Sequence, residues 1–186
     1  VLVDGMEEYW WAARAAAMRI APDSAAIQAL PAAIPAGFRR LRPLIHKGWE
    51  MVLAAAELAR ADLDLERYVS AYDEALTAAL GRWGCSADAL QQALEQVRAE
   101  AIAADRDRWL ARHRFYPGVP ERLQQLRQEG ADWSVLTTKG GAFAAAILAA
   151  AGLEPHRLQG HEQGSKPEVL QRLLALGRPL WFVEDR

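Results

Sequence analysis

The sequence predicts an α/β protein in which one half is helical and the other half alternates strands with helices. Residues 6–115 show apolar side chains at helical spacing among many alanines, and no convincing strand pattern interrupts them. From residue 116 onward, short apolar runs alternate with helical segments that end in glycine. Such alternation is typical of parallel β-α-β units, whose ligands bind at the carboxyl ends of the strands.

The helical half is divided by proline and glycine. Pro22 ends a first helix, and Gly81 and Gly84 end a later one. Predicted helices cover 7–21, a short segment capped by Asp23 or Ser24 and ending at residue 30, 49–60, 66–80, and a long segment from a Ser86 cap to about residue 112.

The second half contains three predicted helices and three predicted strands. Gly130 and Gly152 follow helices in the position where a left-handed glycine commonly ends them, and Pro167 occupies a first-turn position. The expected order is a helix over 120–129, a strand over 133–137, a helix over 142–151, a weak strand over 157–159, a helix from 167 to about 177, and a strand over 180–183.

Composition limits the classes of function. The chain has 186 residues, of which 52% are hydrophobic, and a net charge of −2, which is typical of a folded globular protein. This charge gives no basic footprint for nucleic acid, and no uncharged apolar run reaches membrane-spanning length. Cys85, the single cysteine, excludes an internal disulfide and a cysteine-based zinc site, so we expect a cytoplasmic protein.

Polar side chains gather at the expected strand ends and helix starts. Residues 137–139 (TTK) follow one strand, Lys166 opens a helix, and Glu184 and Asp185 follow the last strand. The start of a helix repels cations. A lysine at this position is explained if the lysine side chain and the start of the helix both face an anion. The acidic pair offers the oxygen ligands that Mg²⁺ prefers. Each feature alone also fits a plain structural role, as a strand end, a helix cap or a solvated surface charge.

Taken in order, these segments resemble the motifs of the haloacid dehalogenase superfamily of phosphohydrolases. Residues 116–119 (YPGV) resemble the segment that enters the helix before the second motif, and 135–139 (VLTTK) resemble the second motif itself. Residues 166–167 (KP) resemble the third motif and 182–185 (FVED) the fourth. The resemblance covers residues 115–186 and rests on the order and spacing of four short motifs.

The resemblance implies a Rossmann-like parallel three-layer α/β core with an all-α helical cap, as in relatives of phosphoglycolate phosphatase and phosphoglucomutase. Residues 1–5 would be a residual core segment, 6–115 the cap, and 116–186 an incomplete core. The implied activity is Mg²⁺-dependent hydrolysis of a small phosphorylated metabolite through an aspartyl-phosphate intermediate.

The resemblance also implies roles for individual residues. Thr137 would bind the phosphoryl oxygens, helped by the N–H groups near Thr138 and Lys139, and Lys166 would neutralise charge on the nucleophile and the phosphate. Asp185, together with Glu184, would hold Mg²⁺.

The densest basic cluster of the cap includes Arg42 and Lys47. We rank a solvated helix edge ahead for this cluster. The alternative is an anion clamp for the distal part of the substrate.

The sequence departs from the superfamily at its first motif, Asp-x-Asp-Gly, which carries the nucleophile. Residues 1–6 read VLVDGM, and Leu2 would replace the nucleophile if Asp4 and Gly5 ended the motif, leaving a catalytically inactive binding protein. We prefer a register in which these residues follow the motif, so that the chain is a fragment truncated at both ends and inactive by itself. The fourth motif also departs, because Glu184 stands where glycine is usual. A metal-independent dehalogenase is a further alternative, against which the acidic pair argues.

Overall fold

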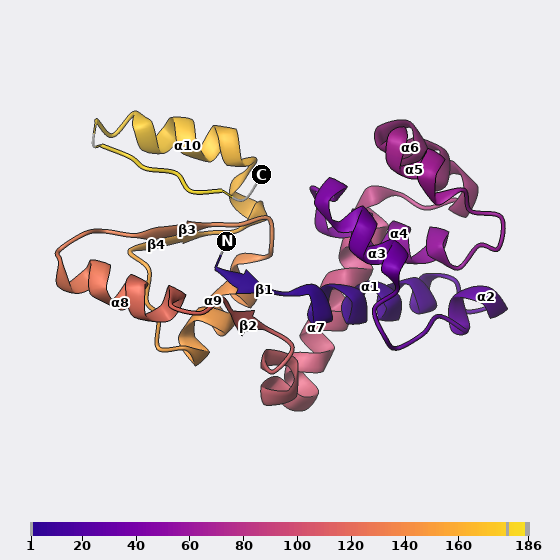
Figure 1. The fold of residues 1–186 in the computed structure, drawn as a ribbon, viewed down its shortest axis with the longest axis horizontal. Helices are drawn as coiled ribbons and strands as arrows, with labels where there is room; N and C mark the ends of the chain where they lie inside the picture. The colour runs from indigo at the N-terminus through magenta and orange to yellow at the C-terminus, as the bar shows by residue number, and fades with distance from the viewer. Residues whose placement is uncertain (1, 178, 185–186) are drawn as a thin grey trace. The chain divides into compact units, whose positions relative to one another are not determined.

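The structure is a computed structural model that describes residues 2–177 and 179–184 (Figure 1). The chain forms two compact units. The helical unit is Met6–Trp109, and the mixed unit combines the residues before Met6 with Leu110 and those that follow it. Within the described part of the chain, no helix has both the length and the apolar character needed to cross a membrane.

The helical unit is built around the packing of its first helix, Met6–Ile20, against α4 (Gly48–Leu58). Alanines make this contact close, because Ala12, Ala13 and Ala16 of the first helix and Ala54 and Ala55 of α4 are all buried. Its helices, with α7 reaching one residue beyond it, are α1 (Met6–Ile20), α2 (Ala25–Gln28), α3 (Ala36–Leu41), the 3₁₀ turn η1 (Arg42–Leu44), α4 (Gly48–Leu58), α5 (Leu65–Ser70), α6 (Tyr72–Trp83) and α7 (Ala87–Leu110).

Trp10 anchors the core of the helical unit. Its side chain is 1% exposed, its indole N–H donates to the carbonyl of Pro31 at 3.0 Å, and its ring centroid lies 5.0 Å from that of Phe38. A buried tryptophan with its polar atom satisfied contributes a large apolar area without an unpaired donor.

A buried ion pair joins α1 to α7. The Glu8 side chain is 0% exposed and that of Arg98 is 3% exposed. The guanidinium donates to both carboxylate oxygens, at 2.6 and 2.9 Å. This two-bond geometry compensates for removing both charges from water.

Two of the expected helices are interrupted. The segment predicted as one helix over 66–80 is divided between α5 and α6, because Ala71 takes a non-helical conformation with φ −127° and ψ 48°. In α7 the break is at Asp105, with φ −160° and ψ 90°. Apolar spacing continues across both breaks, so periodicity alone does not reveal them.

Among its described residues, the mixed unit contains four short strands in two pairs. In the first pair, β1 (Val3–Asp4) lies antiparallel to β2 (Arg114–Phe115). In the second, β3 (Ser134–Leu136) lies parallel to β4 (Arg157–Gln159). Its other elements are α8 (Val119–Gln128), α9 (Gly141–Ala150), the 3₁₀ turn η2 (His161–Gln163) and α10 (Lys166–Leu174).

The prediction of a Rossmann-like three-layer α/β core is wrong. The described chain is mostly helical, and its sheets are two separate two-stranded pairs, of which only β3 and β4 are parallel. The apolar run 180–183, expected as a strand, is not part of a sheet in the described structure, and the Trp181 side chain is 91% exposed. An apolar run becomes a strand only when a neighbouring backbone pairs with it, and hydrophobicity does not supply that partner.

Candidate functional site

The carboxyl ends of β3 and β4 lie side by side in the mixed unit. The Thr137 N–H donates to the carbonyl of Gln159 at 2.9 Å, and the His161 N–H donates to the carbonyl of Lys139 at 3.3 Å. These bonds hold segment 137–141, which follows β3, beside the segment that follows β4. We call residues 137–141 and 160–166 the strand-end site.

Thr137 ends the β3 side of this site. Its side-chain oxygen accepts a hydrogen bond from the Lys139 N–H at 3.1 Å, and the residue is half-buried. A hydroxyl that accepts one bond still has its own proton to donate. Thr138 is exposed, and its backbone belongs to the turn between β3 and α9.

A carboxylate lies at the start of α9. The N–H of Gly141, the first residue of that helix, donates to the two oxygens of Glu162 at 2.9 and 3.2 Å. Unpaired N–H groups and the helix dipole favour an anion at this end. Our sequence reasoning missed Glu162, although an acid three residues after a parallel strand was a visible signal.

Gly160 allows this approach. A Cβ atom at this position would clash with the Glu162 carboxylate and with the backbone of Gly141. The Gly160 N–H also donates to the side-chain oxygen of Gln163 at 2.6 Å. Glycine is therefore required here by space rather than by backbone conformation.

Lys166 is the first residue of α10, as its sequence position predicted. Its ammonium pairs with the Glu184 carboxylate, and the two side chains are 30% and 23% exposed. In the same turn, the Ser165 N–H donates to Glu168 at 2.8 Å, which holds the pKa of that carboxyl below its ordinary value. The helix start thus already carries a paired cation and a bound carboxylate.

The prediction of a metal-binding protein is not supported by the described structure. Glu184 is engaged by Lys166, and Asp185 lies outside the described residues. Across residues 2–177 and 179–184, no group of three or more His, Cys, Asp or Glu side chains could hold a metal ion. One carboxylate paired to a lysine does not fit Mg²⁺, which needs several oxygen ligands.

Arg42 and Lys47 belong to the helical unit. The Arg42 guanidinium lies 4.7 Å above the ring centroid of Tyr9 and donates to the carbonyl of Ile45 at 3.4 Å. Lys47 is exposed and precedes α4, and its N–H donates to Glu50 at 3.2 Å. Arg42 thus has a structural cation–π contact, and a substrate role for either residue stays a prediction.

The structure brings Thr137 and Lys139 beside Gly160 and Glu162, and it places Lys166 six residues after Gly160 at the start of α10. No protein-family model, curated protein or solved structure matches the chain. The resemblance to haloacid dehalogenase-like phosphohydrolases therefore stays a prediction that rests on four short motifs.

Proposed function

We propose that the strand-end site binds the phosphoryl group of a small phosphorylated metabolite, and that the protein hydrolyses its phosphate ester in the cytoplasm. The observation that carries this proposal is the position of Glu162. Its carboxylate accepts from the first N–H of α9, so this point already attracts an oxyanion. A phosphoryl group that displaces the Glu162 carboxylate would accept a hydrogen bond from the same Gly141 N–H.

In this proposal, two side chains of the strand-end site act as further donors to the bound phosphoryl group. Thr137 keeps its hydroxyl proton while accepting from Lys139. The Lys166 ammonium carries three N–H bonds, so its pairing with one Glu184 oxygen leaves donors for a phosphoryl oxygen. In the proposed hydrolysis these groups orient the ester and stabilise charge that develops on it. No described residue is assigned as the nucleophile.

A phosphate-binding protein without turnover is the second candidate. The ion pair between Lys166 and Glu184 favours it, because a cation that is already neutralised stabilises a transition state less than an uncompensated one. Both candidates require phosphate to bind at the strand-end site, and only the first requires release of product.

Phosphate binding is tested first, by titrating the chain with inorganic phosphate in a calorimeter. Glu162→Gln removes the competing charge while keeping the shape of the side chain. We expect it to tighten phosphate binding by about three- to tenfold, since charge–dipole interactions at a helix start contribute about 1 kcal/mol. Glu154→Gln is the matched control, because Glu154 pairs with Arg127 on the exposed surface of the same unit. Equal phosphate affinity in all three proteins would contradict the proposed site.

Turnover is tested in a chain extended at its start by an apolar strand that ends in Asp-x-Asp-Gly, because the chain by itself is expected to be inactive. The substrate is p-nitrophenyl phosphate, with Mg²⁺ or with a chelator. Lys166→Ala should lower turnover on the order of a hundredfold, since it removes charge stabilisation of the reacting group. Phosphate binding without any hydrolysis would support the second candidate. Chloride release from 2-chloropropionate, without phosphate-ester hydrolysis, would instead support the dehalogenase alternative.

A further inference from the structure

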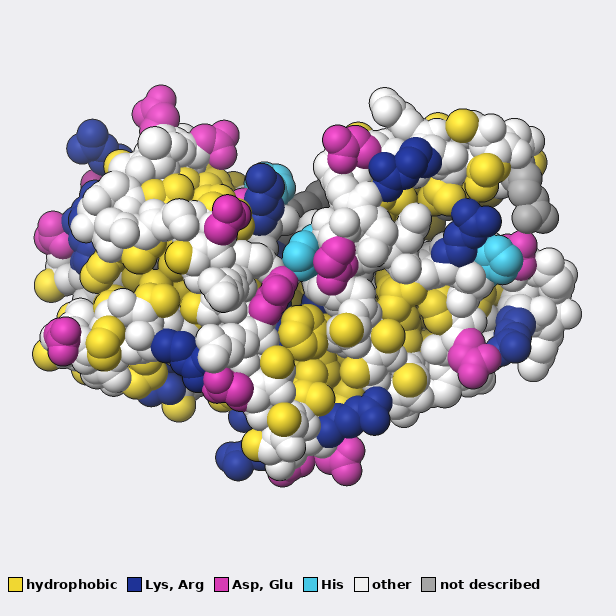
Figure 2. All heavy atoms as spheres, turned by 180° about the vertical axis from the view of Figure 1, so that it is seen from behind, with side chains coloured by type: hydrophobic (Ala, Val, Ile, Leu, Met, Phe, Trp, Pro, Cys, Tyr) yellow, Lys and Arg dark blue, Asp and Glu magenta, His cyan; other side chains and the backbone are white. Residues whose placement is uncertain are grey.

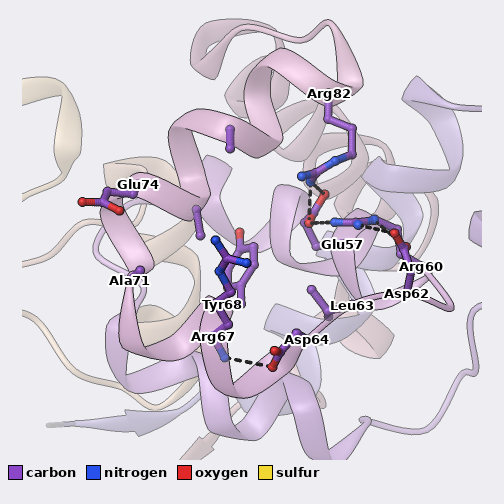
Figure 3. Close-up of a pocket in the computed structure, with 12 residues that line it drawn as sticks. Glu57, Arg60, Asp62, Leu63, Asp64, Arg67, Tyr68, Ala71, Glu74 and Arg82 are labelled. Carbon is purple, nitrogen blue, oxygen red and sulfur yellow. Dashed lines mark hydrogen bonds and ion pairs between the residues drawn. The ribbon is translucent and has the colours of Figure 1, made fainter.

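The helical unit contains a pocket between α4, α5 and α6 (Figure 3). Its volume is about 440 Å³, within the range of small-molecule sites. Side chains of both kinds line it: Leu63, Ala75 and Ala78 are apolar, and Glu57, Arg67 and Tyr68 are polar. The pocket lies within one compact unit and is separate from the strand-end site.

Tyr68 is the unusual member of this lining. The residue is 5% exposed, yet its hydroxyl has no hydrogen-bond partner among the described residues. Figure 3 shows the hydroxyl pointing into the space that the labelled residues enclose. Burial raises the pKa of this hydroxyl, so it stays protonated and remains a donor. A buried donor without a partner is rare, because its lost hydration is not replaced.

The acidic wall of the pocket is already neutralised. Glu57 is fully buried, and its carboxylate accepts from Arg60 at 2.6 Å and from Arg82 at 2.7 and 2.8 Å. The indole N–H of Trp83 donates to it at 2.7 Å. With two guanidiniums beside it, this carboxylate does not attract a cationic ligand.

Arg67 supplies a cation on the opposite wall. The residue is exposed on α5, and its guanidinium pairs with no carboxylate of the described residues, because the nearby Asp64 accepts only from the Arg67 backbone N–H. Arg67 and Tyr68 are consecutive residues of α5, and both line the pocket. A neutral donor and a cation therefore both line the pocket, together with apolar side chains.

We propose that this pocket binds a small organic monocarboxylate. Its carboxylate accepts from the Tyr68 hydroxyl and the Arg67 guanidinium, and its apolar body packs against Leu63, Ala75 and Ala78. Three arginines and four acidic side chains line the pocket, so its formal charge is slightly negative, and a doubly charged phosphate meets more repulsion than a singly charged carboxylate does.

Calorimetric titration of the full chain with hexanoate, and separately with inorganic phosphate, tests the proposal. We expect saturable heat from hexanoate. Any heat from phosphate should be the same in the parent protein and in Tyr68→Phe, because phosphate is not expected to bind in this pocket. Tyr68→Phe should weaken hexanoate binding by about ten- to a hundredfold, the value of a hydrogen bond to a charged group. The melting temperature should not fall, because the variant removes a buried polar atom that has no partner in the described structure.

Tyr72→Phe is the matched control. The Tyr72 hydroxyl donates to Glu50 at 3.0 Å, and this residue does not line the pocket. It should lower the melting temperature and leave hexanoate affinity unchanged. The proposal is overturned if hexanoate does not bind, if Tyr68→Phe binds it as tightly as the parent protein, or if phosphate competes with hexanoate and Tyr68→Phe weakens both.

Discussion

Replacing Arg98 by methionine tests a buried ion pair of the helical unit. Arg98 and Glu8 are 3% and 0% exposed and share two hydrogen bonds between α7 and α1. Methionine keeps much of the side-chain volume but removes the guanidinium, so the buried carboxylate loses its compensating charge. The change therefore isolates charge from packing.

The expected cost is about 3–5 kcal/mol of unfolding free energy, the usual result of removing one partner from a buried ion pair. Natural domains unfold with about 5–15 kcal/mol, so the variant should be marginal. With a urea slope of about 2 kcal/mol per molar, the midpoint should fall by about 2 M. Adding Glu8→Leu should return the stability to within about 1 kcal/mol of the parent, because the buried carboxylate is then removed as well.

Urea unfolding followed by far-ultraviolet circular dichroism measures these differences. Arg19→Met is the control, because Arg19 and Glu100 join the same two helices at the surface, with side chains 40% and 53% exposed. An exposed pair contributes less than about 1 kcal/mol. If Arg98→Met costs no more than Arg19→Met, or if the double variant is as unstable as the single one, the reasoning is refuted.

Two further predictions concern alkaline pH and glycine. Burial raises the pKa values of Tyr68 and Tyr72, so above about pH 10 the unfolded chain loses protons that the folded chain keeps. The stability that these protonated hydroxyls contribute is complete below that pH and falls as the pH rises. Urea midpoints measured at several pH values should show this decrease, and the decrease should be smaller in Tyr68→Phe. Gly160→Ala should destabilise the mixed unit and abolish phosphate binding, whereas Gly81→Ala, which meets open space in α6, should add about 0.4–1 kcal/mol by urea unfolding.

Local signals predicted the local structure well. Gly130 and Gly152 follow α8 and α9 with positive φ, as their positions after apolar runs indicated, and Ser24 caps α2. Residues 157–159, a weak strand candidate, form β4. These features depend on neighbours within a few residues, which the sequence displays directly.

Pairing between distant segments was not predictable in the same way. Glu8 and Arg98 are ninety residues apart, and the local sequence around either residue does not indicate that the two form a pair. The predicted strand over residues 180–183 was wrong for the same reason. These residues have the composition of a strand but no backbone partner in the described structure. In the strand-end site, Thr137 and Lys166 were predicted from their positions, whereas Glu162 was overlooked in the sequence and was recognised from its bond to Gly141.

Charge is distributed without a dominant sign. On the face shown in Figure 2, Lys and Arg side chains are interspersed with Asp and Glu rather than gathered into one patch. This agrees with the net charge of −2. Any selectivity for an anion must then come from local donors such as those around Glu162 and Tyr68, because no long-range field on this face attracts one.

The pairing of β1 with β2 makes the helical unit interchangeable. Asp4 and Arg114 are register partners, so the two backbone segments that flank the helical unit meet at one rung of the ladder, where the paired Cα atoms lie about 5 Å apart. A segment whose two ends are held that close can be lengthened, shortened or exchanged while the flanking backbone keeps its position. A tight two-residue turn could bridge the same gap. Evolution, or a protein engineer, could therefore graft a different insert at this point.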